Sequence, residues 1–206
     1  MSNHPDHDRT TTLTPSVPDE LTISLETVVD DETAAAYHDL YRETFAELAT
    51  LAAERQVLHE HEFLSDMRDP RVHKYVARDE RGRVVGMSTI TAHLETVPWI
   101  NPEFFSHHYP EHARRRAIYY LGFTLVDRRV RQNRVFAAMV DRIVEMLIAE
   151  RAVCTWDICA HNDGNGLGRN IDKIVRRTAE VEIAPVDRQT YYAATFSGQR
   201  AGMALP

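Results

Sequence analysis

The chain has 206 residues, 43% of them hydrophobic, with 24 Lys and Arg against 31 Asp and Glu, a formal net charge of −7 at pH 7. This length and apolar content predict a single domain over residues 21–196, with a disordered tail at residues 1–20 and a flexible tail at residues 197–206. The acidic balance argues against a general nucleic-acid role, so no nucleic-acid partner is expected.

Cysteine usage and hydropathy predict a cytoplasmic protein without a membrane partner. Cys154 and Cys159 are the only cysteines and lie five residues apart on one expected strand, so we do not expect them to pair with each other. Two sparse cysteines are typical of a reducing compartment. No apolar run approaches the ~20 residues that span a bilayer, and residues 1–8 lack the apolar core of a signal peptide.

The first elements are a strand and two helices. Residues 21–28 alternate apolar and polar side chains, as a half-buried strand does. Asp30 and Asp31 offer N-caps for a long helix. Its apolar residues recur at three- and four-residue steps, namely Tyr37, Leu40, Tyr41, Phe45, Leu48 and Leu51. A second, shorter helix is predicted from 59 to 67.

Three strands follow. Residues 72–77 and 84–94 are joined by the link 78–83, which has Gly82 where a hairpin needs positive φ. Residues 115–126 are predicted to form the next strand, whose apolar run begins at Ala117 and passes into an arginine-dense turn.

The last elements are predicted as a helix over 134–149, a strand over 152–160, a turn cluster at 162–168 and a helix beyond it. The residues of that last helix expected to face inward are Leu167, Ile171, Ile174 and Val175. Residues 180–183 and 190–196 are predicted to form an antiparallel pair.

This order predicts an α/β (α+β mixed) fold with a central mixed sheet of about seven strands flanked by helices. The strands at 115–126 and 152–160 are joined through a helix, which implies a parallel pair with a right-handed crossover. Hairpins on either side imply antiparallel neighbours.

The turn after residue 126 is a candidate phosphate site. Arginines crowd this region at positions 114, 115, 116, 128, 129, 131 and 134. A strand that feeds a helix leaves backbone N–H groups available at the helix N-terminus, and these groups, the helix dipole and nearby arginines suit a phosphate. The alternative is a solvated face of surface arginines.

The sequence at this turn carries a family resemblance. Leu125-Val126-Asp127 ends the strand, Arg131-Gln132-Asn133-Arg134-Val135-Phe136 opens the helix, and Asn162 follows the next strand. With the element order, these features resemble the GNAT superfamily of N-acyltransferases over roughly residues 21–196. In that family a Val-Asp-Pro-like step is followed by Arg/Gln-x-x-Gly-x-Gly/Ala, and an asparagine often follows the strand after the crossover.

The resemblance implies acetyl-CoA or another acyl-CoA as co-substrate, with loop amides around the pyrophosphate and strand amides against the pantetheine. The implied cofactor-binding residues are Thr124, Leu125, Val126, Arg131, Gln132, Asn133, Arg134, Val135, Phe136 and Asn162. Arg134 and Phe136 replace the two loop glycines, which allow close backbone approach. Arg134 can instead supply a charge-assisted contact. The family's tyrosine acid is also missing, since Arg169 and Asn170 occupy that region.

Acyl transfer to an amine needs a group or water relay that takes the amine proton, and a polarised carbonyl. Period-two alternation puts Ile118, Tyr120, Gly122 and Thr124 on one strand face, and Tyr119, Leu121, Phe123 and Leu125 on the other. By position in the family Tyr120 matches the base; the alternative is a core tyrosine with a paired hydroxyl. His93 and Glu95 are predicted to share a face of the neighbouring strand and to reach the amine, Glu95 through water; the alternative is a solvated strand face.

Residues 96–114 form an unusually long link with six aromatic or histidine side chains: Trp99, Phe104, Phe105, His107, His108 and Tyr109. We expect this link to shape the acceptor pocket or to pack on a second subunit, which makes a homodimer plausible; the alternative is a patch that covers the sheet. The histidine clusters at 59–61 and 107–112 lack zinc-ligand spacing, so no metal is expected.

Three readings of the function remain at this point. The first is an acyltransferase that moves an acyl group, most simply acetyl, from a coenzyme A thioester to an amine of a small molecule or peptide. The second is a protein of the same fold that senses a ligand or binds a partner, which the missing glycines and tyrosine favour. The third is different chemistry on a substrate with no coenzyme.

Overall fold

The computed structural model describes residues 21–53, 55–130 and 132–195. The expected tails at residues 1–20 and 197–206 lie outside these described residues, as do Phe196 and the candidate ligand Arg131. The strands are β1 (Leu21–Glu26), β2 (Val72–Asp79), β3 (Val84–Thr91), β4 (Ile118–Val126) and β5 (Val153–Thr155). The helices are α1 (Asp31–Phe45), α2 (Glu60–Arg68), α3 (Pro102–His108), α4 (Pro110–Arg114), α5 (Gln132–Ala149), α6 (Ala160–Gly164) and α7 (Leu167–Thr178), with 3₁₀ turns η1 (Ala46–Thr50) and η2 (Leu94–Thr96).

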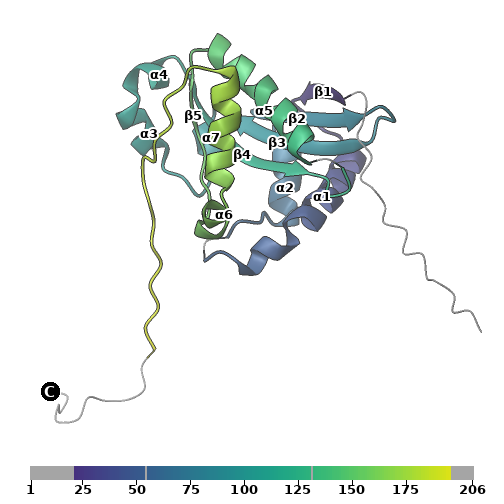
Figure 1. Cartoon of the computed structure of the whole chain (residues 1–206), viewed down its shortest axis with the longest axis horizontal. Coiled ribbons are helices and arrows are strands. Elements are labelled where there is room, and N and C mark those ends of the chain that lie inside the picture. The colour runs from purple at the N-terminus through teal and green to yellow at the C-terminus, as the bar shows by residue number, and fades with distance from the viewer. Residues whose placement is uncertain (1–20, 54, 131, 196–206) are drawn as a thin grey trace, which may run out of the picture.

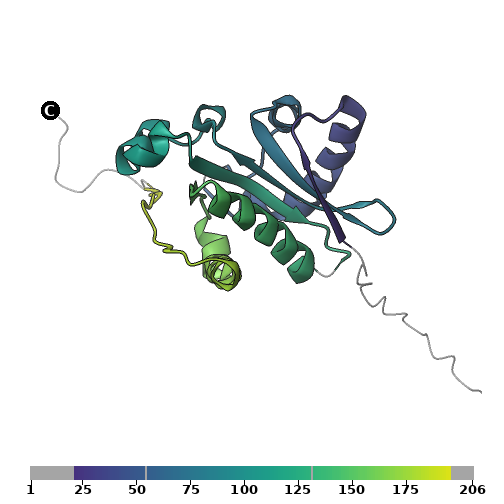
Figure 2. The same ribbon diagram turned by 90° about the horizontal axis from the view of Figure 1, so that it is seen from above.

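The strands form one mixed sheet in the order β1-β2-β3-β4-β5. All neighbours are antiparallel except β4 and β5, which run parallel and are joined through α5. The predicted mixed α/β fold with its parallel pair is therefore confirmed. Figure 2 shows the sheet between two helical layers, with α1 and α2 on one face and α5 and α7 on the other.

The predicted seven strands are five in the part of the chain that the structure describes. Residues 180–195 contain no strand, so the expected antiparallel pair at 180–183 and 190–196 is wrong over that range. Most of this segment is exposed and runs away from the body of the domain (Figure 1). Its alternating sequence is compatible with a strand, but a strand also needs a neighbour to satisfy its backbone, and none lies beside it here.

Local sequence signals explain where α1 and α2 begin. The Asp30 carboxylate accepts hydrogen bonds from Thr33 N (3.0 Å) and Thr33 Oγ1 (2.7 Å), as an N-cap does. At the start of α2 the Glu62 side chain accepts the N–H of His59 at 2.7 Å. Each helix then buries its apolar stripe against the sheet.

The core packs on both faces of the sheet. On the α1–α2 face, Tyr41 and Phe63 pack against Met87 and Leu125 of the sheet. On the α5 face, Val135 and Met139 pack against Val85 and Val126. A smaller cluster under α3 and α4 contains Ile118 and Tyr120.

A β-bulge in β4 overturns the predicted alternation of its faces. The register with β3 shifts between Ser88 and Ile90, so Gly122 and Phe123 together oppose Thr89. Beyond the bulge the faces exchange: Phe123 and Leu125 pack on the α1–α2 side, whereas Tyr119 and Leu121 pack on the α5 side. The prediction that these four share one face is wrong. A glycine inside a strand is a known signal for a bulge.

Several element boundaries differ from the predicted ones. The strand expected at 84–94 ends at Thr91, and the strand expected at 152–160 spans only Val153–Thr155. The link at 96–114 is largely helical, since it contains α3 and α4. Asn101 caps α3 by accepting Glu103 N at 3.0 Å, and Pro102 occupies its first turn, so this region has ordinary helix-start signals. None of the described helices is long and apolar enough to cross a membrane.

Candidate functional site

Strands β4 and β5 part early and leave a notch between them. Their pairing runs only from Ile118 opposite Val153 to Tyr120 opposite Thr155, while β4 continues to Val126. Beyond the bulge, alternate residues of β4 bond to β3: Phe123 N donates to Thr89 Oγ1 at 3.2 Å, and Asp127 N donates to Val85 O at 2.9 Å. By the alternation of strand backbone, Thr124 and Val126 turn their N–H and C=O groups toward the notch.

The N-terminus of α5 follows the end of β4. The N–H groups of Gln132 and Asn133 belong to its first turn and have no acceptor within the helix. Before it, the buried Asp127 carboxylate accepts Arg129 N at 2.8 Å and Arg129 Nε at 2.9 Å. Asp127 therefore fixes the turn that leads from β4 into α5.

The structure places the predicted cofactor-binding residues that it describes in four different surroundings. The backbone of Thr124, Leu125 and Val126 lies along the notch, and the side chains of Asn133 and Arg134 are exposed at the start of α5. Val135 is buried and Phe136 is half-buried, both against the core cluster on the α5 face. Because their side chains pack there, Val135 and Phe136 can offer only backbone groups to a cofactor. Asn162 is half-buried in α6 and does not end a strand.

Tyr120 stands at the base of the notch and is 2% exposed. Its hydroxyl donates to Asp157, which follows β5, and accepts a hydrogen bond from Trp99 Nε1 at 2.9 Å. The rings of Trp99 and Tyr120 meet edge to face at 6.3 Å. Tyr120 thus connects β4 to the segments that follow β5 and η2.

A small hollow opens beside Tyr120 on the α1–α2 side of the sheet. Its walls include Thr89, Thr91, Tyr120 and Gly122 from β3 and β4, Trp99 from the link after η2, and Asp66 from α2. Its volume of about 20 Å³ is the space of a single water-sized group. Of the predicted acceptor-pocket segment 96–114, Trp99 lines this hollow, whereas Phe105 and Tyr109 cover the sheet at Ile118.

Asp66 lines this hollow but was not predicted from the sequence as a site residue. It follows Phe63 by three residues and precedes Met67, both of which are fully buried, so it lies on the inward face of α2. Burial raises the pKa of the Asp66 carboxyl to about 6, although the nearby Lys74 ammonium opposes the shift. The sequence signal that could have identified Asp66 was its position as a carboxylate on the apolar stripe of an amphipathic helix.

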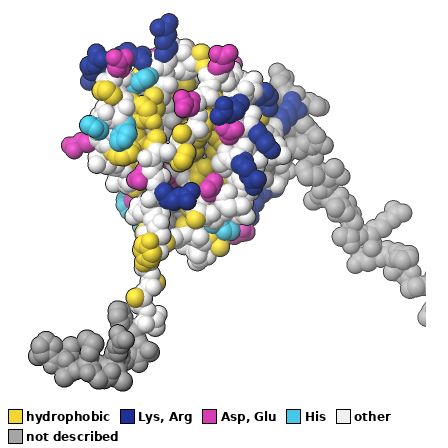
Figure 3. Space-filling model, turned by 60° about the vertical axis from the view of Figure 1, so that its left-hand side comes forward, with side chains coloured by type: hydrophobic (Ala, Val, Ile, Leu, Met, Phe, Trp, Pro, Cys, Tyr) yellow, Lys and Arg dark blue, Asp and Glu magenta, His cyan; other side chains and the backbone are white. Residues whose placement is uncertain are grey.

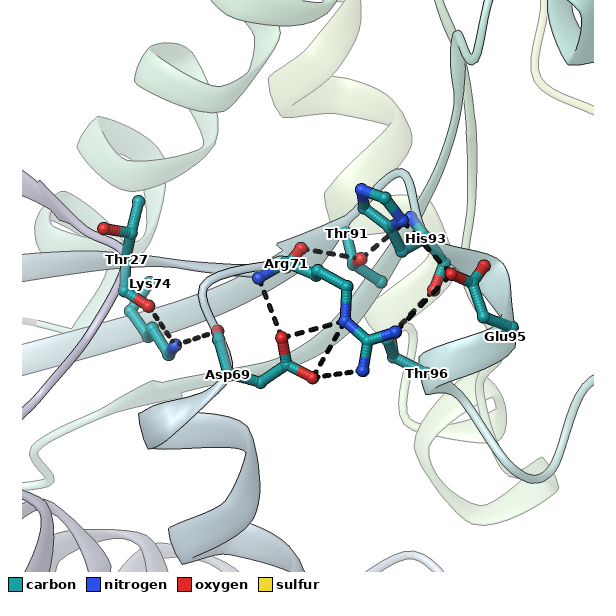
Figure 4. Close-up of polar contacts among 8 residues, drawn as sticks. All are labelled: Thr27, Asp69, Arg71, Lys74, Thr91, His93, Glu95 and Thr96. Carbon is teal, nitrogen blue, oxygen red and sulfur yellow. Dashed lines mark hydrogen bonds and ion pairs between the residues drawn. The ribbon is translucent and has the colours of Figure 1, made fainter.

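Lys74 was also missed, and it is fully buried on β2. Its Nζ donates to Thr27 O and to Asp69 O, both at 2.8 Å (Figure 4). Burial lowers the pKa of Lys74 to about 8. The ammonium therefore joins the loop before α1 to the loop after α2.

A polar network continues from Asp69 to Thr91, which lines the hollow, and to Glu95 (Figure 4). The Asp69 carboxylate accepts from Arg71 Nε and from the Arg71 backbone, and Arg71 lies 3.6 Å from Glu95. Thr91 Oγ1 donates to Arg71 O and accepts from His93 N, both at 2.9 Å. These contacts fasten the end of α2 to the end of β3.

His93 and Glu95 lie beyond the end of β3, in and before η2, so the expected shared strand face is wrong. Their side chains nevertheless meet, with 3.1 Å between Nδ1 and Oε1. The Glu95 side chain is 62% exposed. Its own backbone N–H, followed by His93 and Arg71, lowers the pKa of Glu95, which makes it a weaker base.

A larger hollow of about 310 Å³ lies between α1, Val84 and Arg129. It contains the carboxylates of Asp39 and Glu43 against the one guanidinium of Arg129. Two negative charges against one positive charge do not favour the binding of a diphosphate in this hollow, whereas the N–H groups at the start of α5 do. Among the described residues no group of three or more His, Cys, Asp or Glu side chains is arranged to hold a metal ion.

Two solved structures resemble the chain over most of its length. One is the aminoglycoside antibiotic 6'-N-acetyltransferase AAC(6')-Ih from Acinetobacter baumannii, with 9% identity, a TM-score of 0.50, and coverage of 86% of this chain and 100% of that chain. The other is a probable acetyltransferase, with 13% identity, a TM-score of 0.52, and coverage of 84% of this chain and 99% of that chain. No protein-family model matches the sequence, and no curated protein matches it either. With its mixed sheet, parallel β4–β5 pair and flanking helices, the chain has the GNAT fold.

Proposed function

We propose that the protein is an acyltransferase that moves an acyl group, most simply acetyl, from a coenzyme A thioester to an amine of a small molecule or peptide. The observation that carries the proposal is the notch between β4 and β5, which opens onto the N-terminus of α5. An exposed strand edge suits the amides of a pantetheine arm, and a helix N-terminus suits its diphosphate.

The residues at the notch fit this group despite the missing glycines. The Phe136 ring is half-buried against the core cluster on the α5 face, and the exposed Arg134 adds positive charge at the start of α5. Bound acyl-CoA would supply an activated acyl carbonyl. The backbone N–H groups along Thr124–Val126 would hold the arm, and the first turn of α5 would hold the phosphates. Tyr120, His93 and Glu95 stay predictions as catalytic groups.

A second candidate function is a ligand-sensing or partner-binding protein with the same fold. Arg134 and Phe136 stand where the family has glycines, and Arg169 and Asn170 stand where it has a tyrosine acid. These substitutions favour loss of turnover with ligand binding retained. Binding and turnover therefore need separate measurements.

The first experiment titrates the full chain with acetyl-CoA and follows the thermal unfolding midpoint. Because a ligand that binds only the native state stabilises it, 100-fold excess over Kd should add about 2.7 kcal/mol to the unfolding free energy. Release of free thiol in the presence of primary amines then measures transfer. No saturable stabilisation at millimolar acetyl-CoA rejects the proposal. Stabilisation without thiol release for any amine supports the second candidate.

We also propose a cytoplasmic homodimer. Both cysteines are free thiols, as a reducing compartment would keep them. Apolar side chains are exposed on residues 179–195, including Val186 at 45%, Tyr191 at 52% and Tyr192 at 92%. Figure 3 shows such side chains on the segment that leaves the body. Covering them with a second copy would remove apolar surface from water.

A further inference from the structure

Asp66 differs from the other polar groups around the hollow beside Tyr120, because those groups are already engaged within the protein. Thr89 Oγ1 accepts Phe123 N, and Thr91 Oγ1 bonds to Arg71 O and His93 N. The Tyr120 hydroxyl bonds to Asp157 and Trp99. Among the described residues, Asp66 makes no hydrogen bond or ion pair that would satisfy its carboxylate.

With a pKa of about 6, the Asp66 carboxyl is mostly anionic at neutral pH, and one cation and two carboxylates lie near it. Lys74 of β2 faces it, but the Lys74 Nζ is held by two backbone carbonyls, of Thr27 and Asp69. The other charges that act on Asp66 are the carboxylates of Asp69 and Glu62. A partly desolvated carboxylate without a partner attracts a cation.

The place and size of the hollow define which cation fits. Gly122 and Tyr120 also line it, and they are the β4 residues at the point where the notch opens. With room for one water-sized group, it accepts an ammonium head but no larger cation such as a guanidinium. Trp99 also lines the hollow, and an aromatic side chain is a favourable neighbour for an ammonium group.

We infer that Asp66 binds the nitrogen of a primary amine in this hollow, first as the counter-ion of the ammonium form and then as the acceptor of its proton. The binding step is argued from the hollow alone. The proton-accepting step also depends on the proposed acyl transfer. In that step one ammonium proton moves to the Asp66 carboxylate, and the amine nitrogen forms a bond to the thioester carbon. The carbon–sulfur bond breaks, the second amine proton passes through solvent to the thiolate, and Asp66 returns its proton to solvent.

The binding step is tested with 1-aminobutane as the probe and 1-butanol as its neutral counterpart. Chemical-shift changes of the full chain are followed at pH 7.5 in the wild type, in Asp66→Asn and in Asp172→Asn. Asp172 is a matched control, because its carboxylate pairs with Arg176 on the outside of α7. We expect saturable shifts around the hollow for the amine only, weakened at least tenfold by Asp66→Asn, about 1.4 kcal/mol, and unchanged by Asp172→Asn.

A second measurement varies pH. Binding of 1-aminobutane should weaken as pH falls through about 6, where the Asp66 carboxyl takes up its proton. Equal affinity in Asp66→Asn, or equal shifts with 1-butanol, overturns the inference.

Transfer is measured apart from binding. With acetyl-CoA and 1-aminobutane, Asp66→Asn should lower the rate of thiol release by about 100-fold or more, while acetyl-CoA still raises its unfolding midpoint as in the wild type. Failure of acetyl-CoA to bind either protein refutes the proposed function and leaves the amine-binding step standing. Full turnover in Asp66→Asn refutes the proton-accepting step alone.

Discussion

Gly122 and Thr89 face each other across β4 and β3, and a Cβ at position 122 would lie 2.5 Å from Thr89 Oγ1. Real Cβ contacts are not that short, so any other residue must displace Thr89. That threonine also accepts Phe123 N and so holds the bulge in place. A single hydrogen in place of a side chain thus permits the bulge, and the bulge sets which β4 side chains face the hollow.

Gly122→Ala should therefore destabilise the fold by about 1–3 kcal/mol through overpacking. The measurement is the urea midpoint of unfolding at unchanged m-value. Gly164→Ala is the matched control, because nothing lies within 4 Å of its Cβ position. Equal midpoints for the two variants would show that the Thr89 contact does not constrain β4.

Asp66→Asn should raise the unfolding free energy at neutral pH. The pKa of Asp66 is about 6 in the folded chain, above its ordinary value near 4, so the folded state binds more protons between those two pH values. Wild-type stability from this group therefore falls as pH rises from about 4 to 6, and the neutral asparagine removes that loss.

The difference in unfolding free energy between Asp66→Asn and the wild type should grow over this pH range and reach about 1–2 kcal/mol. Denaturant titrations at pH 4, 5, 6 and 7 measure it. A difference that does not change with pH would mean that the Asp66 carboxyl titrates normally. More stability with less amine binding is the trade-off expected of a functional carboxylate.

At the scale of elements, unequal strand lengths create the site. The pairing of β5 stops at Thr155 while β4 runs on to Val126, and α5 begins a short turn later. The result is a strand edge that leads to a helix N-terminus. Neither element alone makes this arrangement, since it depends on where one strand stops relative to the other.

Arg134→Glu tests the α5 N-terminus as the phosphate site. A glutamate in the first turn interacts favourably with the helix dipole, which offsets part of the loss of the contact that Arg134 makes in the unliganded protein. The same negative charge repels the coenzyme phosphates, so the Kd for coenzyme A should rise at least tenfold, about 1.4 kcal/mol. Calorimetric titration measures the Kd, and thermal unfolding of the unliganded variant shows that it is folded.

Arg142→Glu is the control for this prediction, because Arg142 lies on the exposed side of α5 beyond its first two turns. It should leave the Kd for coenzyme A unchanged. If both variants weaken binding equally, overall charge and not the helix N-terminus governs the interaction.

At the scale of the whole molecule, the sheet ends at β5, and residues 179–195 extend away from it without pairing (Figure 1). An edge strand has unpaired backbone groups, and an extended apolar segment can pair with such an edge. Two copies related by a two-fold axis could each pair this segment with the β5 edge of the other copy. That exchange would satisfy the backbone groups of the edge and cover the apolar side chains of the segment.

A chain shortened to residues 1–184 should accordingly be monomeric, while the full chain should be dimeric, by light scattering after size exclusion. The cut leaves Val181, whose carbonyl accepts Arg176 NH1 at 3.0 Å, in place. Tyr192→Asp in the full chain is the companion variant, because it removes apolar contact without shortening the backbone. A monomeric full chain, or a dimeric shortened one, contradicts the prediction.

The sequence located most elements because their signals are local. Asp30 as a cap, the apolar period of α1 and the helix between β4 and β5 could all be read from spacing. The candidate site was only partly predictable: Tyr120, which lines the hollow, was named from the family resemblance by its position on the strand, whereas Asp66 and Lys74 were not predicted. Asp66 and Lys74 stand out because they are charged residues at positions that become buried. That burial can be known only when the packing of α2 and β2 in the folded protein is known.

The sequence by itself determined the mixed α/β order, the parallel crossover through α5 and an arginine-rich turn at its start, because periodicity, capping and crossover handedness depend on neighbours in the chain. Only the tertiary structure decided the β4 bulge, the early end of β5 and the placement of Asp66 and Tyr120 around one hollow. Those depend on contacts between residues far apart in sequence, such as Gly122 with Thr89, where a Cβ in place of the glycine hydrogen would lie 2.5 Å from Thr89 Oγ1.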